Sequence, residues 1–343
     1  MKAKRARFGF ILAFGGLLTG GALVAQSAYT TPIGIMAYRI EGGTPAAPVT
    51  TTFSLPLADT PGASGAKVFV ANAYDGTVLT ATGAGWTDGA LALSAFPYDA
   101  RVLSGSATGT RAAITANTTD TVNLAGRDLA ALGLSAGTEG DSLELVPVDT
   151  LETLFANDLF DGGASADTAD GVTVKHLGAA GGAYYYDTTA EQWVEALAPT
   201  TPASDIRLSP EGMVAVTRRG PALTFYVTGR VASTDLNFPV ANSGVTYTHV
   251  GFPVDKTLGE LGLDTAIAGW VSDANPDLAD LVGVSVGAGW VYYYHDGSAW
   301  RRTVGAASDR GSVVVPAGKP LQILRRGATA GTSSLVLSNP VSS

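Results

Sequence analysis

The sequence predicts an all-β protein built from three tandem antiparallel β-sandwich or open-barrel modules with short helical turns. Runs of Thr, Val, Ala and Tyr alternate with Gly, Asp and Pro along a chain of 343 residues that contains 43 glycines. β-Branched and aromatic residues favour strands, whereas Gly, Asp and Pro favour the turns between them. The chain lacks the alternation of strands with longer helical patterns that indicates a parallel α/β sheet.

An aromatic hairpin occurs twice. Three tyrosines at 184–186 are followed by a polar turn and Trp193, and three tyrosines at 292–294 are followed by a second polar turn and Trp300. A tryptophan on the returning strand can meet the tyrosines across the strand pair. The hairpin therefore predicts a unit whose aromatic side chains build a core.

The landmarks of the two copies keep a constant spacing. Trp193 and Trp300 are 107 residues apart, and so are the two Arg-Arg-Gly runs, 218–220 and 325–327. We expect each run to end a strand, with a charge at the sheet edge and a glycine in the turn. Constant spacing of this kind predicts internal duplication. The expected limits are 1–28 for a signal peptide and 29–112, 113–223 and 224–343 for the three β modules.

Within each module the expected elements follow in the same order, with Trp86 in the first module at the place of Trp193. Three segments with apolar residues three or four apart, 128–134, 149–155 and 256–263, predict short helical turns. The expected strands are residues 31–40, 51–57, 66–71, 91–94, 100–103, 111–116, 142–148, 171–177, 206–210, 213–217, 224–231, 250–254, 313–316, 321–324 and 333–337.

The last expected strand, residues 333–337, resembles the strand that opens each module. It could pair with the next copy of the chain, which would give head-to-tail assembly by strand exchange. Alternatively, it completes the third module.

The first 28 residues have the pattern of an export signal. Basic residues precede an apolar stretch, 8–25, that is broken by glycines and ends in small residues. We expect cleavage between residues 25 and 28, and an uncleaved membrane anchor is the alternative. No later stretch is apolar enough to cross a bilayer. The mature protein is therefore expected to be extracellular or at the cell surface, with the periplasm as an alternative, and to have no membrane contact.

The charge of the chain argues against nucleic-acid binding. The formal net charge is −9, and loss of the four basic residues in the signal would leave 17 basic and 30 acidic residues, a charge of −13. Such a protein repels phosphate backbones. The chain contains no cysteine, so the exported protein has no disulfide to stabilise it.

Two patterns could indicate catalysis or metal binding, and neither is convincing. Residues 283–287, Gly-Val-Ser-Val-Gly, match a nucleophile elbow around Ser285, but a tyrosine-rich strand follows where a helix is required. His176, His249 and His295 have no spacing that places two ligands on one face. We therefore expect no catalytic, cofactor-binding or metal-binding residue, and no enzyme activity.

Two acidic loops in the sequence could bind calcium. Clustered carboxylates with nearby glycines offer hard oxygen ligands, which suit calcium outside the cell. The spacing of a known calcium loop is missing, and solvated loops are the alternative. The carboxylates are Asp158, Asp161, Asp167 and Asp170 in one loop, and Asp273, Asp277 and Asp280 in the matching loop.

Aromatic residues could also form a platform for sugars if they point outward. Alternation along a strand places Tyr184 and Tyr186 on one face and Tyr185 on the other, and likewise places Tyr293 opposite its neighbours. One face is expected to be core, so a sugar could stack only on the other face. The tryptophans considered for this role are Trp86, Trp193, Trp270, Trp290 and Trp300.

Three stretches carry a family resemblance: TPIGIMAYRI at 31–40, TTFSLPLADT at 51–60, and AAITANTTDTVNLAGRDLAALGLSAGTEGDSLELVPVDTLETLF at 112–155. Through them the chain resembles an uncharacterised family of exported β-rich repeat proteins from verrucomicrobial bacteria. The resemblance implies export and a repeat architecture, and it supplies no activity or binding residues. Members often end in a C-terminal sorting segment, which we do not expect in the final residues 341–343.

The function expected from these features is that of an exported noncatalytic structural protein of the cell surface, or of an extracellular filament or appendage. Its expected partner is a further copy of itself, and head-to-tail strand exchange is one expected mode of assembly. The alternative is a glycan-binding or adhesin module that uses exposed aromatic residues.

Overall fold

The computed structural model describes residues 32–155, 159–176, 181–287, 289–305, 308–327 and 330–340. The predicted signal peptide, residues 1–28, lies outside this range, as does Asp158. Within the described residues the protein is all-β, as predicted. Its helices there are the single turns α1 (Leu151–Leu154), α2 (Leu258–Leu261) and α3 (Leu263–Ala266), and none is long or apolar enough to cross a membrane.

Buried hydrophobic residues form three large clusters. The inserted core contains residues from 63–145, the central core combines residues from 36–57 and 151–227, and the C-terminal core contains residues from 232–337. Along the sequence, the segment that forms the inserted core therefore lies between the two segments that form the central core. The expected module limits at 112/113 and 223/224 fall inside strands β7 (Arg111–Asn117) and β15 (Leu223–Arg230).

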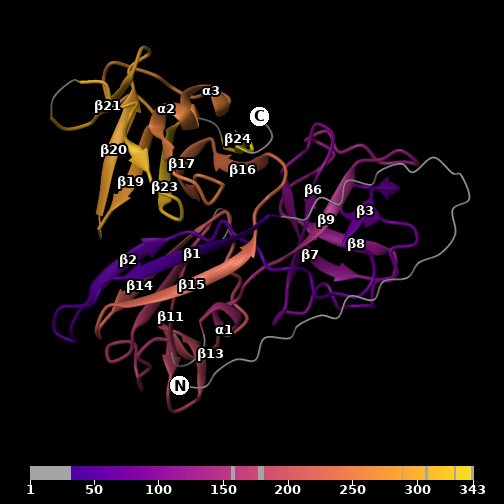
Figure 1. Ribbon diagram of the computed structural model, residues 1–343, viewed down its shortest axis with the longest axis horizontal. Coiled ribbons are helices and arrows are strands. Elements are labelled where there is room, and N and C mark those ends of the chain that lie inside the picture. Colours follow the sequence, from indigo (N-terminus) through magenta and orange to yellow (C-terminus); the bar gives the residue numbers. More distant parts are fainter. Residues whose placement is uncertain are drawn as a thin grey trace, which may run out of the picture. The chain divides into compact units, whose positions relative to one another are not determined.

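Each core carries one main antiparallel sheet (Figure 1). The inserted core has the order β3-β9-β6-β7-β8-β5-β4, with β3 (Val68–Val70), β4 (Ala73–Tyr74), β5 (Val78–Thr80), β6 (Tyr98–Val102), β8 (Thr121–Ala125) and β9 (Ser142–Pro147). The central core has the order β13-β12-β11-β10-β14-β2, with β2 (Val49–Phe53), β10 (Gly171–Lys175), β11 (Gly182–Asp187), β12 (Gln192–Glu195), β13 (Ala198–Pro202) and β14 (Met213–Arg218). The C-terminal core has the order β17-β23-β19-β20-β21, with β17 (Ser243–His249), β19 (Leu281–Val286), β20 (Gly289–His295), β21 (Trp300–Arg302) and β23 (Pro320–Arg326), beside a small pair of β18 (Lys256–Thr257) and β22 (Val314–Val315).

Five strands of each sheet follow one topology. If the five strands are numbered in chain order, they lie side by side in the order 1-5-2-3-4. The three sets are β3-β9-β6-β7-β8, β2-β14-β10-β11-β12 and β17-β23-β19-β20-β21. Every neighbouring pair within the sets is antiparallel.

The central and C-terminal cores each have a second layer, a two-stranded ribbon. Strand β1 (Ile33–Ile40) pairs with β15, and β16 (Leu236–Ala241) pairs with β24 (Thr332–Leu337). In the first ribbon Tyr38 stacks on Phe225 with ring centroids 5.3 Å apart, and both rings are buried in the central core. The last strand of the chain thus pairs within the C-terminal core, as in the alternative in which it completes its own module.

The aromatic hairpins correspond with a shift of one residue from the expected alignment. Val172 lies opposite Tyr184, and Val282 lies opposite Tyr293, so Tyr184 corresponds to Tyr293. The shift arises because the two turns differ in length. Trp193 follows its cross-strand partner Tyr186 by seven residues, whereas Trp300 follows its partner His295 by five.

The tryptophans nevertheless have matching surroundings. Trp193 meets Tyr186 at a centroid distance of 6.0 Å, and Trp300 meets His295 at 5.4 Å, both edge to face. Each indole is buried in the core of its own sheet. Trp86 differs from the expectation: it precedes β6 in the chain and packs on Phe69, so it is not the counterpart of Trp193.

Two of the three expected helical turns are confirmed. Both begin with a threonine whose side chain accepts a backbone hydrogen bond in a capping box, Thr150 in α1 and Thr257 in α2. Residues 128–134 instead form hydrogen-bonded turns, in which Asp128 Oδ1 accepts from the N–H groups of Ala130 and Ala131. Such a side-chain acceptor competes with helix formation.

In both sheets that contain an aromatic hairpin, a buried arginine–aspartate ion pair lies near the end of a strand. Arg218, the last residue of β14, donates to Asp170 just before β10, and Arg325 near the end of β23 donates to Asp280. Both carboxylates are almost fully buried, at 1% and 0% exposure. Each also accepts the N–H of the following arginine, Arg219 in one copy and Arg326 in the other.

Replacing Arg218 by Met should lower the stability of the protein strongly, because Asp170 would stay buried without a countercharge. Loss of one partner from a buried pair costs about 3–5 kcal/mol. Arg325→Met should have a similar cost. The urea midpoint measures the effect, and Arg39→Met is the control, because its pair with Glu41 is exposed and should contribute at most about 1 kcal/mol. Equal midpoints for Arg218→Met and Arg39→Met would contradict this assignment.

Candidate functional site

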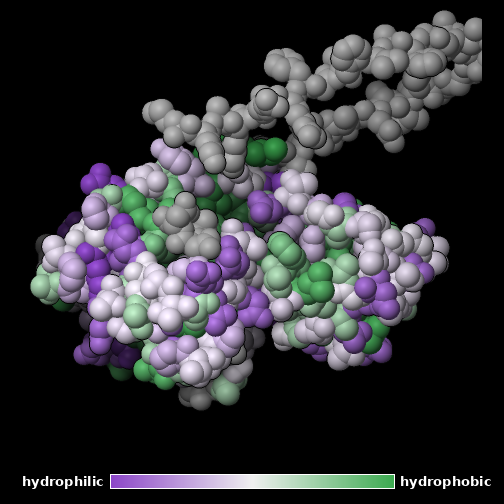
Figure 2. All heavy atoms as spheres, turned by 90° about the horizontal axis from the view of Figure 1, so that it is seen from below, coloured by the Kyte–Doolittle hydropathy of each residue, from purple (hydrophilic) through white to green (hydrophobic). Residues whose placement is uncertain are grey.

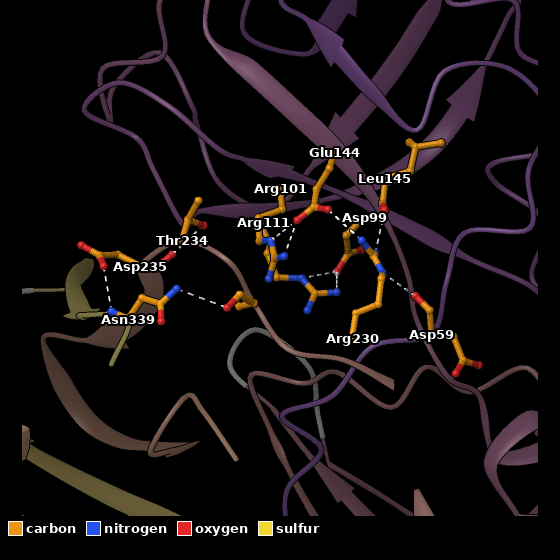
Figure 3. Close-up of polar contacts among 11 residues, drawn as sticks. Asp59, Asp99, Arg101, Arg111, Glu144, Leu145, Arg230, Thr234, Asp235 and Asn339 are labelled. Atoms are coloured by element: carbon orange, nitrogen blue, oxygen red, sulfur yellow. Dashed lines mark hydrogen bonds and ion pairs between the residues drawn. The ribbon is translucent and has the colours of Figure 1, made fainter. Parts of the chain in front are cut away.

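Charged side chains gather where the ribbon strand β15 meets the sheet of the inserted core (Figure 3). Glu144 on β9 accepts from Arg101 on β6 and from Arg230 on β15, the latter at 2.9 Å. Arg230 also donates to the carbonyl oxygens of Asp59 and Leu145. Because the Glu144 carboxylate is buried and shared by two guanidinium groups, it ties the central core to the inserted core.

A second carboxylate in this region is shared in the same way. Asp99 on β6 accepts from Arg111 Nε at 3.2 Å, and its other oxygen accepts from Arg207 of the central core. Asp99 and Arg111 are both buried. Both oxygens of Asp99 are therefore committed to arginines.

A cavity of about 670 Å³ opens beside Asp99, lined by residues of all three cores. This volume is within the range of small-molecule sites. Charged and hydroxyl-bearing side chains stand among apolar ones on its wall. They include Asp99, Arg111, Arg127, Arg207 and Glu211, with Ser209, Thr332 and Ser334 supplying hydroxyl groups.

Glu211 is the carboxyl group of the cavity wall with an altered pKa. Burial raises its pKa to about 7, and nearby Asp99 adds to the increase while Arg111 and Arg127 oppose it. Its Oε1 atom is buried and has no hydrogen-bond partner within the described part of the chain. A carboxyl group in this setting favours the neutral form.

His249 lies next to this region and is held neutral. Its Nδ1 accepts from the N–H of Gly251, so its Nε2 carries the proton and donates to the carbonyl oxygen of Pro210. Burial lowers the pKa of His249 to about 4. This histidine therefore joins β17 to the loop that carries Glu211, and it does not act as a metal ligand in this arrangement.

The histidines and the serine considered from the sequence do not come together. His176 lines the cavity, His249 is buried, and His295 is half-buried at the end of β20, where it packs on Trp300. Ser285 is buried on β19 and shares a 2.6 Å hydrogen bond with Thr52 on β2. It is not exposed on a strained turn, as a nucleophile would be.

The acidic loops also take a structural role. Asp170 and Asp280 are the buried partners of Arg218 and Arg325, and Asp161 lies 3.4 Å from Arg218. No group of three potential metal-ligating side chains occurs in the described ranges. Two of the carboxylates considered for calcium are thus neutralised by arginine.

The aromatic residues expected to form a sugar platform are largely inside. Trp86, Trp193 and Trp300 are buried, and so are Tyr185 and Tyr293. Tyr185 lies in a small separate cluster with Ala169 and Val194, which covers the face opposite the central core. A buried ring offers no face to a sugar, so these five residues cannot supply the platform.

Comparison of the chain with family models, curated proteins and solved structures found no match. Sequence reasoning missed the arginines of the site, because Arg111, Arg127 and Arg207 are far apart in the chain and share no local motif. The arrangement can hold an anion or a hydroxylated ligand, whereas its most buried carboxylate, Asp99, is occupied by two guanidinium groups.

Glu211→Gln should change the pH dependence of stability. The folded-state pKa of Glu211, about 7, is above its ordinary value of 4.5, so its stabilising contribution is complete below pH 4.5 and is lost as the pH rises through 7. The variant should therefore melt about 2–4 °C above the parent at pH 8, with no gain at pH 4.5. Thermal denaturation measures this. Exposed Glu139→Gln should match the parent at both pH values, and a pH-independent difference for Glu211→Gln would contradict the account.

Proposed function

We propose that this chain is an exported noncatalytic structural protein of the cell surface or of an extracellular filament, and that it associates with further copies of itself through open sheet edges. The observation that carries the proposal is a pair of different edge strands, β1 and β3, that expose apolar side chains: Ile33 and Ile35 on β1, and Val68 and Val70 on β3. Export rests on the sequence of residues 1–28. Figure 2 illustrates one face on which hydrophobic residues reach the surface among polar ones.

Strand β1 presents both backbone groups and apolar side chains. Val231 N–H donates to the Pro32 carbonyl, so alternation along the antiparallel pair directs the backbone groups of Ile33 and Ile35 away from β15. These isoleucines are 74% and 69% exposed. An open edge with apolar side chains is a template for pairing with another chain.

Strand β3 is the second such edge. It lies at the end of the sheet of the inserted core, paired on one side with β9. Val68 and Val70 on this strand are exposed. By contrast, the edge strand β13 contains Pro199 and Pro202, which have no N–H to donate and so discourage pairing.

Pairing of β1 with β3 of the next copy would be a head-to-tail contact. A contact between two different surfaces leaves one of each surface free at the ends, so copies add without limit unless a ring closes. Strand addition of this kind needs no exchange of β24, which is already paired with β16. A filament or layer is the expected product.

Charged substitutions at the two edges test this proposal. Ile35→Lys and Val70→Lys should each weaken association of the mature protein by at least about tenfold, because a lysine at an open edge opposes pairing. Mass photometry and negative-stain microscopy over a range of concentrations measure the assemblies. Each variant keeps one intact edge, so an equimolar mixture should form dimers that do not grow.

Val336→Lys is the matched control, since Val336 is an exposed residue of the paired ribbon strand β24. It should assemble like the parent. A parent protein that stays monomeric at every concentration would refute self-association. Assemblies that persist in both edge variants would show that other surfaces form the contact.

A further inference from the structure

Three arginines, Arg111, Arg127 and Arg207, line the cavity described above. Arg127 donates to the carbonyl and side-chain oxygens of Asn237, at 2.7 and 3.0 Å, and to Ser334 Oγ at 2.8 Å. All three acceptors are neutral. Within the described residues Arg127 has no carboxylate at ion-pair distance, although it is half-buried. A guanidinium group removed from water without a countercharge favours binding of an anion.

Arg207, on the same cavity wall, has N–H donors that make no hydrogen bond to the described part of the protein. It uses one Nη atom for Asp99, and its side chain is about one third exposed, at 32%. These donors belong to its Nε and other Nη atoms. The planar guanidinium group can therefore bind an incoming carboxylate through two parallel hydrogen bonds.

Two of the three carboxyl groups on the cavity wall are paired with arginine or disfavoured as ions. Asp99 is shared by Arg111 and Arg207, whereas Asp128 accepts two backbone N–H groups and has no arginine partner among the described residues. Burial favours the neutral form of Glu211. Glu211 is the carboxyl group whose charge acts on Arg127, and it favours the neutral form below about pH 7. At such pH Arg127 and Arg207 can receive an anion.

The rest of the wall suits a hydroxylated ligand. Ser209, Thr332 and Ser334 supply hydroxyl groups, which can donate or accept hydrogen bonds. Ala131, Leu132 and Pro239 supply apolar surface on which the carbon face of a ring could rest. We propose that this cavity binds a small sugar acid, or a hydroxycarboxylate of similar size, through its carboxylate at Arg127 and Arg207 and its hydroxyl groups at the neighbouring serines and threonine.

Isothermal titration of the mature protein with sodium D-glucuronate tests the proposal, with D-glucose as the neutral match and sodium acetate as the carboxylate without hydroxyl groups. Glucuronate should bind more tightly than either comparison compound by at least about tenfold, because it alone satisfies both the arginines and the hydroxyl groups. Glucose or acetate binding as tightly as glucuronate would overturn the ligand class. No heat from glucuronate up to about 50 mM, far above the millimolar affinity of a weak site, would overturn the site.

Two variants locate the binding. Arg207→Gln and Arg127→Gln should each lower the affinity for glucuronate by at least about tenfold, because each removes a charge-assisted hydrogen-bond donor. Arg39→Gln, which alters an exposed arginine of β1, should bind like the parent. Arg127 also holds Asn237, so a melting curve must show that its variant is folded, and Arg207→Gln provides the independent result. Unchanged affinity in folded Arg207→Gln would place the ligand elsewhere and overturn the proposal.

Discussion

The buried pair of Arg218 with Asp170, and its counterpart Arg325 with Asp280, constrains the architecture of the two hairpin sheets. A carboxylate removed from water must be compensated by a countercharge and by hydrogen bonds. Asp170 obtains both, because it also accepts the N–H groups of Arg219 and Asp161. The end of β14 is thereby fixed to the loop that precedes β10. Any slip of one residue between these strands would leave the carboxylate unpaired, so the pair helps to hold the register in which the tryptophans face the core.

Much of the fold could be predicted from the sequence. The all-β class follows from composition, and the equivalence of Trp193 and Trp300 follows from their spacing. The alignment of the tyrosines could not be obtained in this way, because three identical residues in a row permit a shift of one position. The length of the turn decides between the alternatives, and the sequence pattern does not reveal which turn residues pair. The strand partners of β1 and β24 were equally hidden, since tertiary packing selects them.

The polar site was harder to foresee than the cores. Arg111 and Arg127 belong to the inserted segment and Arg207 to the central core, and they come together around one cavity. No spacing rule links arginines that come from separate strands and loops. The sequence did indicate the paired arginine runs, with Arg219 and Arg326 expected to end strands at sheet edges. It did not reveal that the preceding Arg218 and Arg325 are buried and neutralise buried carboxylates.

Amide hydrogen exchange at Arg219 and Arg326 tests this account most directly, because each N–H donates at 2.6 Å to the carboxylate in question. Both amides should exchange slowly in the parent protein. In Asp280→Asn, which removes the charge from one site alone, Arg326 should lose much of its protection while Arg219 keeps its own. Rapid exchange of both amides in the parent, or equal loss at both sites in the variant, would contradict the claim that each sheet is locked by its own buried pair.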